Sequence, residues 1–218
     1  NPDVVLILGD RFETHAAATT AMLMNIPIAH IHGGEITEGA IDEKIRHSIT
    51  KMSSLHFTST DEYRNRVIQM GESSDTVFSV GAPGIDNIIN MNLLSKDKLE
   101  DELSWGIIGT TALFTYHPET LSVVDIKKEI KKILEIINNS NINVLFTYSN
   151  SDNGGRLINN EIEVFASKNK DRYLVAKSLG QKKYLSAMKH LDFVIGNTSS
   201  GIIEAASFQK PVINIGNR

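Results

Sequence analysis

The sequence AHIHGGEITEGAIDEKIRHSITKMS, residues 29–53, predicts a strand, a turn and a helix in succession. An apolar run leads into the pair Gly33-Gly34, whose backbone reaches angles that other residues avoid. Apolar side chains then recur at helical spacing, at Ile41, Ile45, Ile49 and Met52. Four acids gather along the same stretch, at Glu35, Glu38, Asp42 and Glu43. Because ligands bind outside the carboxyl ends of strands in open α/β sheets, this stretch is a candidate site.

The chain on both sides of this stretch alternates in the same way. The run from Val4 to Leu8 is apolar throughout, which predicts a strand buried on both faces of a parallel sheet. Alternating strands and helices are typical of a doubly wound α/β layer. In this half, strands are expected at 4–8, 26–31, 55–59 and 76–80, and helices at 12–25, from about 42, and at 60–71.

A polar helical stretch at 85–103 interrupts the alternation, and we place a domain boundary near Trp105. Beyond it, strands are expected at 111–116, 143–148, 172–176, 192–195 and 211–215, and helices at 123–138, 154–167, 181–190 and 202–208. The sequence therefore predicts an α/β protein with two Rossmann-like doubly wound domains, 1–104 and 105–218, that face a binding cleft. Because strand-like runs adjoin both ends, we expect an internal piece of a longer protein.

The composition excludes several function classes. With 218 residues, of which 41% are hydrophobic, the chain is long enough to form a packed core. A formal net charge of -4 argues against a nucleic-acid partner, which needs clustered Lys and Arg. No apolar run approaches the roughly 18 residues that span a bilayer, so no membrane partner is expected. The absence of cysteine suits a reducing cytoplasm.

The loop from Gly196 to Gly201, GNTSSG, lies between a predicted strand and a predicted helix. Main-chain N–H groups and the positive end of the helix dipole point into such a turn, so a phosphate fits there. Glu204, one turn inside the helix, has a carboxylate that would accept hydrogen bonds from two vicinal sugar hydroxyls. Alternatively, Thr198, Ser199 or Ser200 only caps the helix, and the sequence leaves both interpretations open.

Asp10 and His117 follow predicted strands in the two halves and also have two interpretations. Asp10, followed by Arg11, is either a site residue or the cap of the next helix. His117 either exchanges a proton with a leaving group or is a structural histidine.

Helical spacing offers an ordinary explanation for the charges after the glycine pair. Asp42 and Arg46 are four residues apart, as are Glu43 and His47, so pairing on the helix surface explains them. Histidines stand at positions 30 and 32 of the preceding segment, and no metal site is expected from them.

Taken in order, five motifs resemble the UDP-N-acetylglucosamine 2-epimerase family, and most closely its hydrolysing branch. They are GDRFE at 9–13, HIHGGE at 30–35, IDE with RHSITK at 41–51, YHP at 116–118, and NTSSG with Glu204 and PVINIG at 197–216. The resemblance implies the two-domain fold of B-type glycosyltransferases, with UDP held mainly by the C-terminal half, and a homodimer. It also implies that the first elements of the N-terminal domain and the C-terminal end lie outside this sequence, so that this piece alone is expected to be inactive.

The resemblance further implies a two-step reaction that needs no cofactor and no metal. UDP leaves UDP-N-acetylglucosamine by anti elimination across C1 and C2, and water adds to the resulting 2-acetamidoglucal to release N-acetylmannosamine for sialic acid synthesis. The elimination needs a base at the C2 proton and electrostatic support for the diphosphate. Alternatives are the same reaction on a UDP-2,4-diacetamido-trideoxyhexose, as in legionaminic acid synthesis, a non-hydrolysing epimerase, a non-catalytic UDP-sugar-binding module and a retaining glycosyltransferase.

The resemblance also assigns residues to roles. Asp10 and Asp42 match acidic catalytic positions, and His117 matches a histidine near the diphosphate. Many relatives have a glutamate where this chain has His32, so either His32 takes the acid–base role, or Glu35 supplies the carboxylate, or the substrate differs. Substrate-binding positions are expected at Arg11, Arg46, Ser199, Ser200, Gly201, Glu204 and Arg218.

Overall fold

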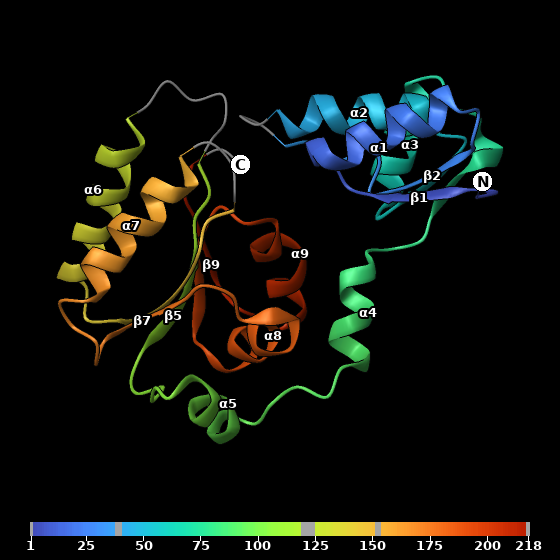
Figure 1. The fold of residues 1–218 in the computed structure, drawn as a ribbon. Helices are drawn as coiled ribbons and strands as arrows, with labels where there is room; N and C mark the ends of the chain where they lie inside the picture. Colours follow the sequence, from blue (N-terminus) through green and yellow to red (C-terminus); the bar gives the residue numbers. More distant parts are fainter. Residues whose placement is uncertain (1, 38–40, 119–124, 151–153, 217–218) are drawn as a thin grey trace. The chain divides into compact units, whose positions relative to one another are not determined.

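The structure is a computed structural model that describes residues 2–37, 41–118, 125–150 and 154–216. The chain forms two compact units, Asn1–Pro83 and Gly84–Arg218, each built on a parallel sheet with helices packed against it (Figure 1). The predicted α/β class with two Rossmann-like sheets is therefore confirmed. Within the described residues, no helix is long and apolar enough to cross a bilayer.

Unit 1 holds, in its described part, a four-stranded parallel sheet in the order β1-β2-β3-β4. The strands are β1 (Val5–Leu8), β2 (Ile28–Ile31), β3 (Leu55–Thr58) and β4 (Val77–Ser79). Three helices lie on one face of this sheet (Figure 1): α1 (Phe12–Leu23), α2 (Asp42–Met52) and α3 (Asp61–Gln69). A short 3-10 helix, η1 (Ser74–Thr76), precedes β4.

The expectation that β1 is buried on both faces is wrong for one of them. Ile7 is 3% exposed and packs with α1 and α2, whereas Leu6 and Leu8 are 63% and 57% exposed. The register aligns Leu8 with Phe78 at the far edge of the sheet, and Phe78 is also exposed. Successive side chains point to opposite faces of a strand, so α1, α2 and α3 cover only the Ile7 face.

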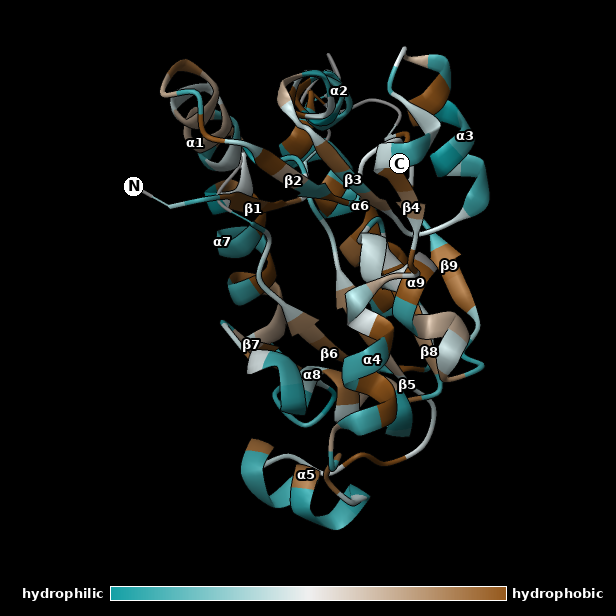
Figure 2. Ribbon diagram, turned by 90° about the vertical axis from the view of Figure 1, so that its right-hand side faces the viewer, coloured by the Kyte–Doolittle hydropathy of each residue, from teal (hydrophilic) through white to brown (hydrophobic). Residues whose placement is uncertain are grey.

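Unit 2 holds, among its described residues, a five-stranded parallel sheet in the order β7-β6-β5-β8-β9. The strands are β5 (Thr111–Thr115), β6 (Asn143–Thr147), β7 (Tyr173–Ala176), β8 (Phe193–Gly196) and β9 (Val212–Asn214). One face packs against α6 (Ile126–Asn139) and α7 (Gly155–Ala166), and the other against α8 (Gly180–His190) and α9 (Ser199–Ser207) (Figure 1). Figure 2 shows the hydrophobic character of the strands, with β9 brown like β1 and β4.

Sheet coverage in unit 2 explains the strongly apolar strands. Phe114 and Phe146 point to the α6–α7 side, whereas Leu113 and Leu145 point to the α8–α9 side, and all four are 0% exposed. Continuous apolar runs are therefore required here, because both faces of the sheet are covered.

The helical stretch predicted at 85–103 forms two helices, α4 (Pro83–Asn90) and α5 (Lys96–Leu103). Leu99 of α5 is fully buried in the same core as Trp105, and the Leu94 N–H donates to Ser186 Oγ of α8 at 2.9 Å. The segment from Gly84 onward thus belongs to the second compact unit. The division of the whole protein into domains at 104/105 stays a prediction.

The strand order of unit 2 determines where a ligand is expected. The chain winds outward from β5 through β6 and β7 in one direction, and through β8 and β9 in the other. The crevice at such a switch point, outside the carboxyl ends of β5 and β8, is the usual ligand position in open α/β sheets. His117 follows β5, and the loop before α9 follows β8, so two predicted site segments meet there.

Candidate functional sites

Each unit gathers predicted site residues at the carboxyl edge of its sheet. In unit 1 these residues form the Asp10 edge, defined as Asp10, His32, Glu35, Asp42 and Arg46. In unit 2 the His117 edge is defined as the predicted residues His117, Ser199 and Ser200, together with Asn150 and Asn197, which hydrogen-bond to His117 and were not predicted.

Arg46 is the centre of the Asp10 edge. Its side chain is buried, with 5% exposure for the residue, and its guanidinium is paired with the Asp10 carboxylate. The same guanidinium donates to the Glu35 carbonyl oxygen at 2.8 Å and to Thr37 Oγ1 at 3.2 Å. One side chain of α2 therefore ties the turn after β1 to the loop after β2, and it fixes the position of Asp10.

Asp42 lies in the first turn of α2, where an acid favours the helix N-terminus, and it is 6% exposed. The predicted surface pair of Glu43 and His47 is present at 3.7 Å. At Arg46, however, the ion pair reaches across the unit to Asp10, which helical spacing does not predict.

His32 and Glu35 form one hydrogen-bonded group. His32 Nδ1 lies 2.5 Å from Glu35 Oε1, and Ser59 Oγ donates to the same oxygen at 2.9 Å. Burial acts to raise the pKa of Glu35, but the hydrogen bonds from His32 and Ser59 and the charges of His32 and Arg46 outweigh it and lower this pKa. Glu35 is therefore a carboxylate at neutral pH that accepts from the Nδ1–H of His32, so a neutral His32 carries its proton on Nδ1 and not on Nε2.

The backbone around this pair is constrained. His32 has φ +67°, a left-handed conformation that is uncommon outside glycine and that often marks functional positions. Gly34 has φ +81°, and a Cβ there would lie 2.4 Å from the Tyr63 carbonyl oxygen, so only glycine fits. The strand-to-helix turn thus packs directly on α3.

His30 supports the turn after β1 from the buried side of the sheet. It is 0% exposed, and its Nε2 lies 2.9 Å from the carbonyl oxygen of Gly9, the residue before Asp10. Burial is the main cause that lowers its pKa to about 4, so His30 is neutral at pH 7 and donates through Nε2. From the sequence, His30 is weighed only as a metal ligand, and Ser59 lies in none of the motifs.

Arg11 lies beside this edge, at the start of α1. It is the residue before the first turn of that helix, and its guanidinium lies 5.2 Å from the Phe12 ring centre and 3.7 Å from Glu13. The expected substrate-binding role of Arg11 stays a prediction.

At the His117 edge, the backbone of His117 is held by a single side chain. Asn197 Oδ1 accepts from the His117 N–H at 2.7 Å, and Asn197 Nδ2 donates to the His117 carbonyl oxygen at 2.8 Å. The Asn150 N–H donates to His117 Nδ1 at 3.1 Å. Because Nδ1 accepts this bond, neutral His117 carries its proton on Nε2 and acts there as a hydrogen-bond donor.

The loop before α9 both caps the helix and presents a hydroxyl. Thr198 Oγ1 accepts from the Ser200 N–H at 3.3 Å, so α9 begins at Ser199, earlier than the predicted start at 202. Ser199 is exposed, whereas Ser200 Oγ is buried and faces the Tyr184 hydroxyl. Of the two serines, Ser199 is therefore the exposed one, and its expected role in substrate binding stays a prediction.

Packing explains two of the remaining predicted positions. A Cβ at Gly201 would lie 3.3 Å from Val212, so glycine lets α9 approach β9. A Cβ at Gly84 would lie 3.2 Å from Glu204 Oε1, so the Glu204 carboxylate lies against the first turn of α4. Arg218 lies outside the described residues.

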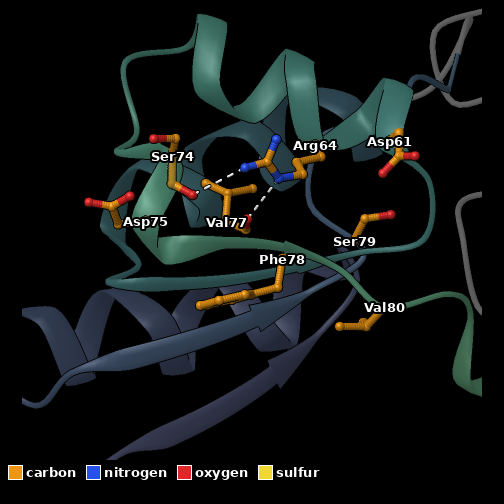
Figure 3. Close-up of a pocket in the computed structure, with 8 residues that line it drawn as sticks. All are labelled: Asp61, Arg64, Ser74, Asp75, Val77, Phe78, Ser79 and Val80. Carbon is orange, nitrogen blue, oxygen red and sulfur yellow. Dashed lines mark hydrogen bonds between the residues drawn. The ribbon is translucent and has the colours of Figure 1, made fainter.

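A separate open pocket lies beside β4, and none of the residues that line it is a predicted site residue (Figure 3). Its main cation, Arg64, donates to the Val77 carbonyl oxygen at 3.0 Å and to the Ser74 carbonyl oxygen at 3.3 Å, so it ties η1 to β4. The pocket is lined by Asp61, Arg64, Ser74, Asp75, Val77, Phe78, Ser79 and Val80.

In the described ranges, no three His, Asp or Glu side chains are arranged to hold a metal ion.

Two parallel sheets with helices packed against them define an open-sheet α/β protein. The sequence profile of the UDP-N-acetylglucosamine 2-epimerase family matches residues 1–218, and the chain belongs to this family. It is 45% identical over its whole length to the GDP/UDP-N,N'-diacetylbacillosamine 2-epimerase (hydrolyzing) of Campylobacter jejuni, and covers 57% of that protein. It is 39% identical over its whole length to the UDP-N,N'-diacetylbacillosamine 2-epimerase (hydrolyzing) of Legionella pneumophila, and again covers 57%.

Solved structures share the fold. The UDP-GlcNAc 2-epimerase of Neisseria meningitidis, solved with UDP-GlcNAc bound, matches with a TM-score of 0.79 at 20% identity, over 100% of this chain and 60% of that one. The B-type glycosyltransferase-like fold class predicted from the motifs is thereby confirmed. The chain spans a little over half the length of the relatives that it matches.

Proposed function

We propose that the natural protein carrying this chain is a hydrolysing nucleotide-sugar 2-epimerase whose substrate is UDP-N,N'-diacetylbacillosamine. The observation that carries the reaction is the acid–base arrangement at the Asp10 edge, with Asp10 paired to Arg46 and His32 paired to Glu35. The names of the two hydrolysing relatives, at 45% and 39% identity, support the substrate. This sugar is a 2,4-diacetamido-trideoxyhexose, the alternative that the His32 position had raised.

In the first step, a base of the Asp10 edge removes the C2 proton, and the C1–O bond breaks as its electron pair leaves with UDP. The C–H electrons form the C1=C2 bond of a glycal. In the second step, water adds its oxygen to C1 and gives one of its protons to a base of this edge. An acid delivers a proton to C2 on the face opposite to the one from which the first proton was removed. We assign these proton transfers to His32 Nε2, oriented by Glu35, and to the carboxylates of Asp10 and Asp42.

The His117 edge would hold the nucleoside diphosphate. Ser199 and the N-terminus of α9 supply donors for the phosphates, and the Nε2–H of His117 supports the charge that develops on the leaving diphosphate. Glu204 would accept from the ribose hydroxyls. The roles of Arg11, Gly201 and Arg218 at the substrate belong to the same proposal.

UDP-N-acetylglucosamine is the second candidate substrate, and it is favoured by the description of the family that matches the whole chain. NMR analysis of products from the full-length protein separates the two. We expect UDP and free 2,4-diacetamido-2,4,6-trideoxymannose, with kcat/KM at least tenfold higher than for UDP-N-acetylglucosamine.

Other products would overturn the proposal. The reverse preference would establish N-acetylmannosamine as the product, and an intact mixture of epimeric UDP-sugars would establish a non-hydrolysing enzyme. UDP binding without solvent exchange at C2 would establish a binding module. The homodimer, which the resemblance implies, and the cytoplasmic location, which the lack of cysteine suits, are also proposals. Light scattering tests the first and cell fractionation the second.

A further inference from the structure

Asn197 was not among the predicted site residues, yet it lies at the switch point of unit 2. Its residue is 2% exposed, and it follows β8 directly. Its main-chain N–H donates to the Thr115 carbonyl oxygen at 3.2 Å, while its side chain makes both bonds to His117. The residue therefore continues the pairing of β5 with β8 beyond the last strand residues.

Only a side-chain amide can make both of these bonds. The carbonyl oxygen accepts from the main-chain N–H of His117, and the NH₂ group donates to the carbonyl oxygen of the same residue. A carboxylate would keep the first bond and would repel the His117 carbonyl oxygen. The adjoining backbone leaves no room to adjust, because a Cβ at Gly196 would lie 1.7 Å from the Thr115 carbonyl oxygen.

We propose that Asn197 is a positioning residue that fixes the backbone of His117 and so holds its imidazole on the Asn150 N–H, in the tautomer that donates from Nε2. The proposal rests on the proposed function for the part that concerns turnover. Asn197 thus couples the two loops. It belongs to the loop after β8, and its side chain binds the main chain of the loop after β5. Asn197 would therefore affect turnover by fixing His117, without touching the reacting atoms itself.

The test compares Asn197→Ala with wild type in the full-length protein, using ¹⁵N-histidine NMR together with kinetics. His117 resonances are assigned by their loss in His117→Gln. In wild type the two ring nitrogens should show separate shifts, with Nε2 protonated. In Asn197→Ala the shifts should converge, because both tautomers are then populated. We expect kcat to fall about 10- to 100-fold, as for impaired general acid or donor support, while Kd for UDP changes less than threefold.

Asn143→Ala is the matched control. Its side-chain amide also donates to a main-chain oxygen, that of Ile108, but it lies at the start of β6, at the opposite edge of the same sheet. This variant should lose stability without changing the His117 shifts or kcat. If Asn197→Ala does not fold, the isosteric Asn197→Asp decides, and it should also mix the tautomers and lower kcat.

Unchanged His117 shifts in a folded Asn197 variant would overturn the proposal, as would full kcat with mixed tautomers. The failure of the proposed function has a different signature. If wild type turned over neither UDP-sugar, the tautomer comparison would still test the positioning of His117, because it needs no substrate.

Discussion

The carboxyl edges of the two units are stabilised in different ways. At the Asp10 edge, charged side chains hold one another, through the ion pair of Arg46 with Asp10 and the hydrogen bond of His32 with Glu35. At the His117 edge, the side-chain amide of Asn197 and the main-chain N–H of Asn150 hold His117 in place. The difference suits the division of labour that we propose, in which the first edge would move protons and the second would bind and support a leaving anion.

The largest effect is expected where the main chain itself is close-packed. Gly196→Ala would place a Cβ 1.7 Å from the Thr115 carbonyl oxygen, at φ +141°, so β5 and β8 would have to separate. We expect this variant not to fold under conditions where wild type is stable, as measured by circular dichroism. Gly180→Ala, also at positive φ but with open space around the Cβ position, should cost only about 1 kcal/mol. Equal stability of the two variants would contradict the close packing of this edge.

His32→Gln should abolish proton transfer and leave the nucleotide site intact. We expect kcat to fall about 10²- to 10⁴-fold, the usual contribution of a general acid or base. Ser59→Ala removes only the second hydrogen bond to Glu35 and should therefore reduce kcat much less. If His32→Gln retained full turnover, the acid–base nitrogen would lie elsewhere at the Asp10 edge.

Arg46→Met keeps the bulk of the side chain and removes its charge. The Asp10 carboxylate would lose its partner, and the Glu35 carbonyl oxygen would lose its donor. Breaking one side of a buried ion pair costs about 3 kcal/mol, which urea denaturation measures. Lys127→Met, which removes an exposed cation 3.4 Å from Glu161, is the control and should change stability by less than about 1 kcal/mol.

His30 should make the stability of unit 1 depend on pH. Its folded pKa is lowered from 6.5 to about 4, so between these values the unfolded chain binds a proton that the folded chain does not. The contribution is fully present above about pH 6.5 and is lost as the pH falls toward 4, by about 3 kcal/mol in total. His30→Gln should flatten this part of the stability profile in denaturation experiments. The same slope in the variant would assign the pH dependence to other groups.

The sequence predicted local structure better than it predicted side-chain partners. Periodicity placed β5 and α6 within a few residues, because burial repeats along each element. Arg46 and Asp10 are 36 residues apart, and Asn197 and His117 are 80 apart, so their contacts depend on how the strands are ordered. Helical spacing points only to partners three or four residues away, and it therefore suggested Asp42 and not Asp10 as the partner of Arg46.

Two other outcomes have specific physical causes. The apolar run of β1 predicted burial on two faces, but an apolar run does not specify whether helices cover both of them, and Leu6 is exposed. Capping and phosphate binding were treated as alternatives for the loop before α9. In the structure Thr198 caps the helix while Ser199 remains exposed, so capping does not exclude the phosphate binding that we propose for Ser199.

The most direct test of this division of labour is the affinity of the full-length Asp10→Asn variant for UDP, measured by calorimetry on protein whose turnover is assayed in parallel. Asn keeps the shape of the side chain and removes the charge that Arg46 holds. We expect the Asp10→Asn variant to lose turnover, while its Kd for UDP stays within threefold of that of wild type. Full turnover, or a loss of UDP binding in a folded variant, would contradict it.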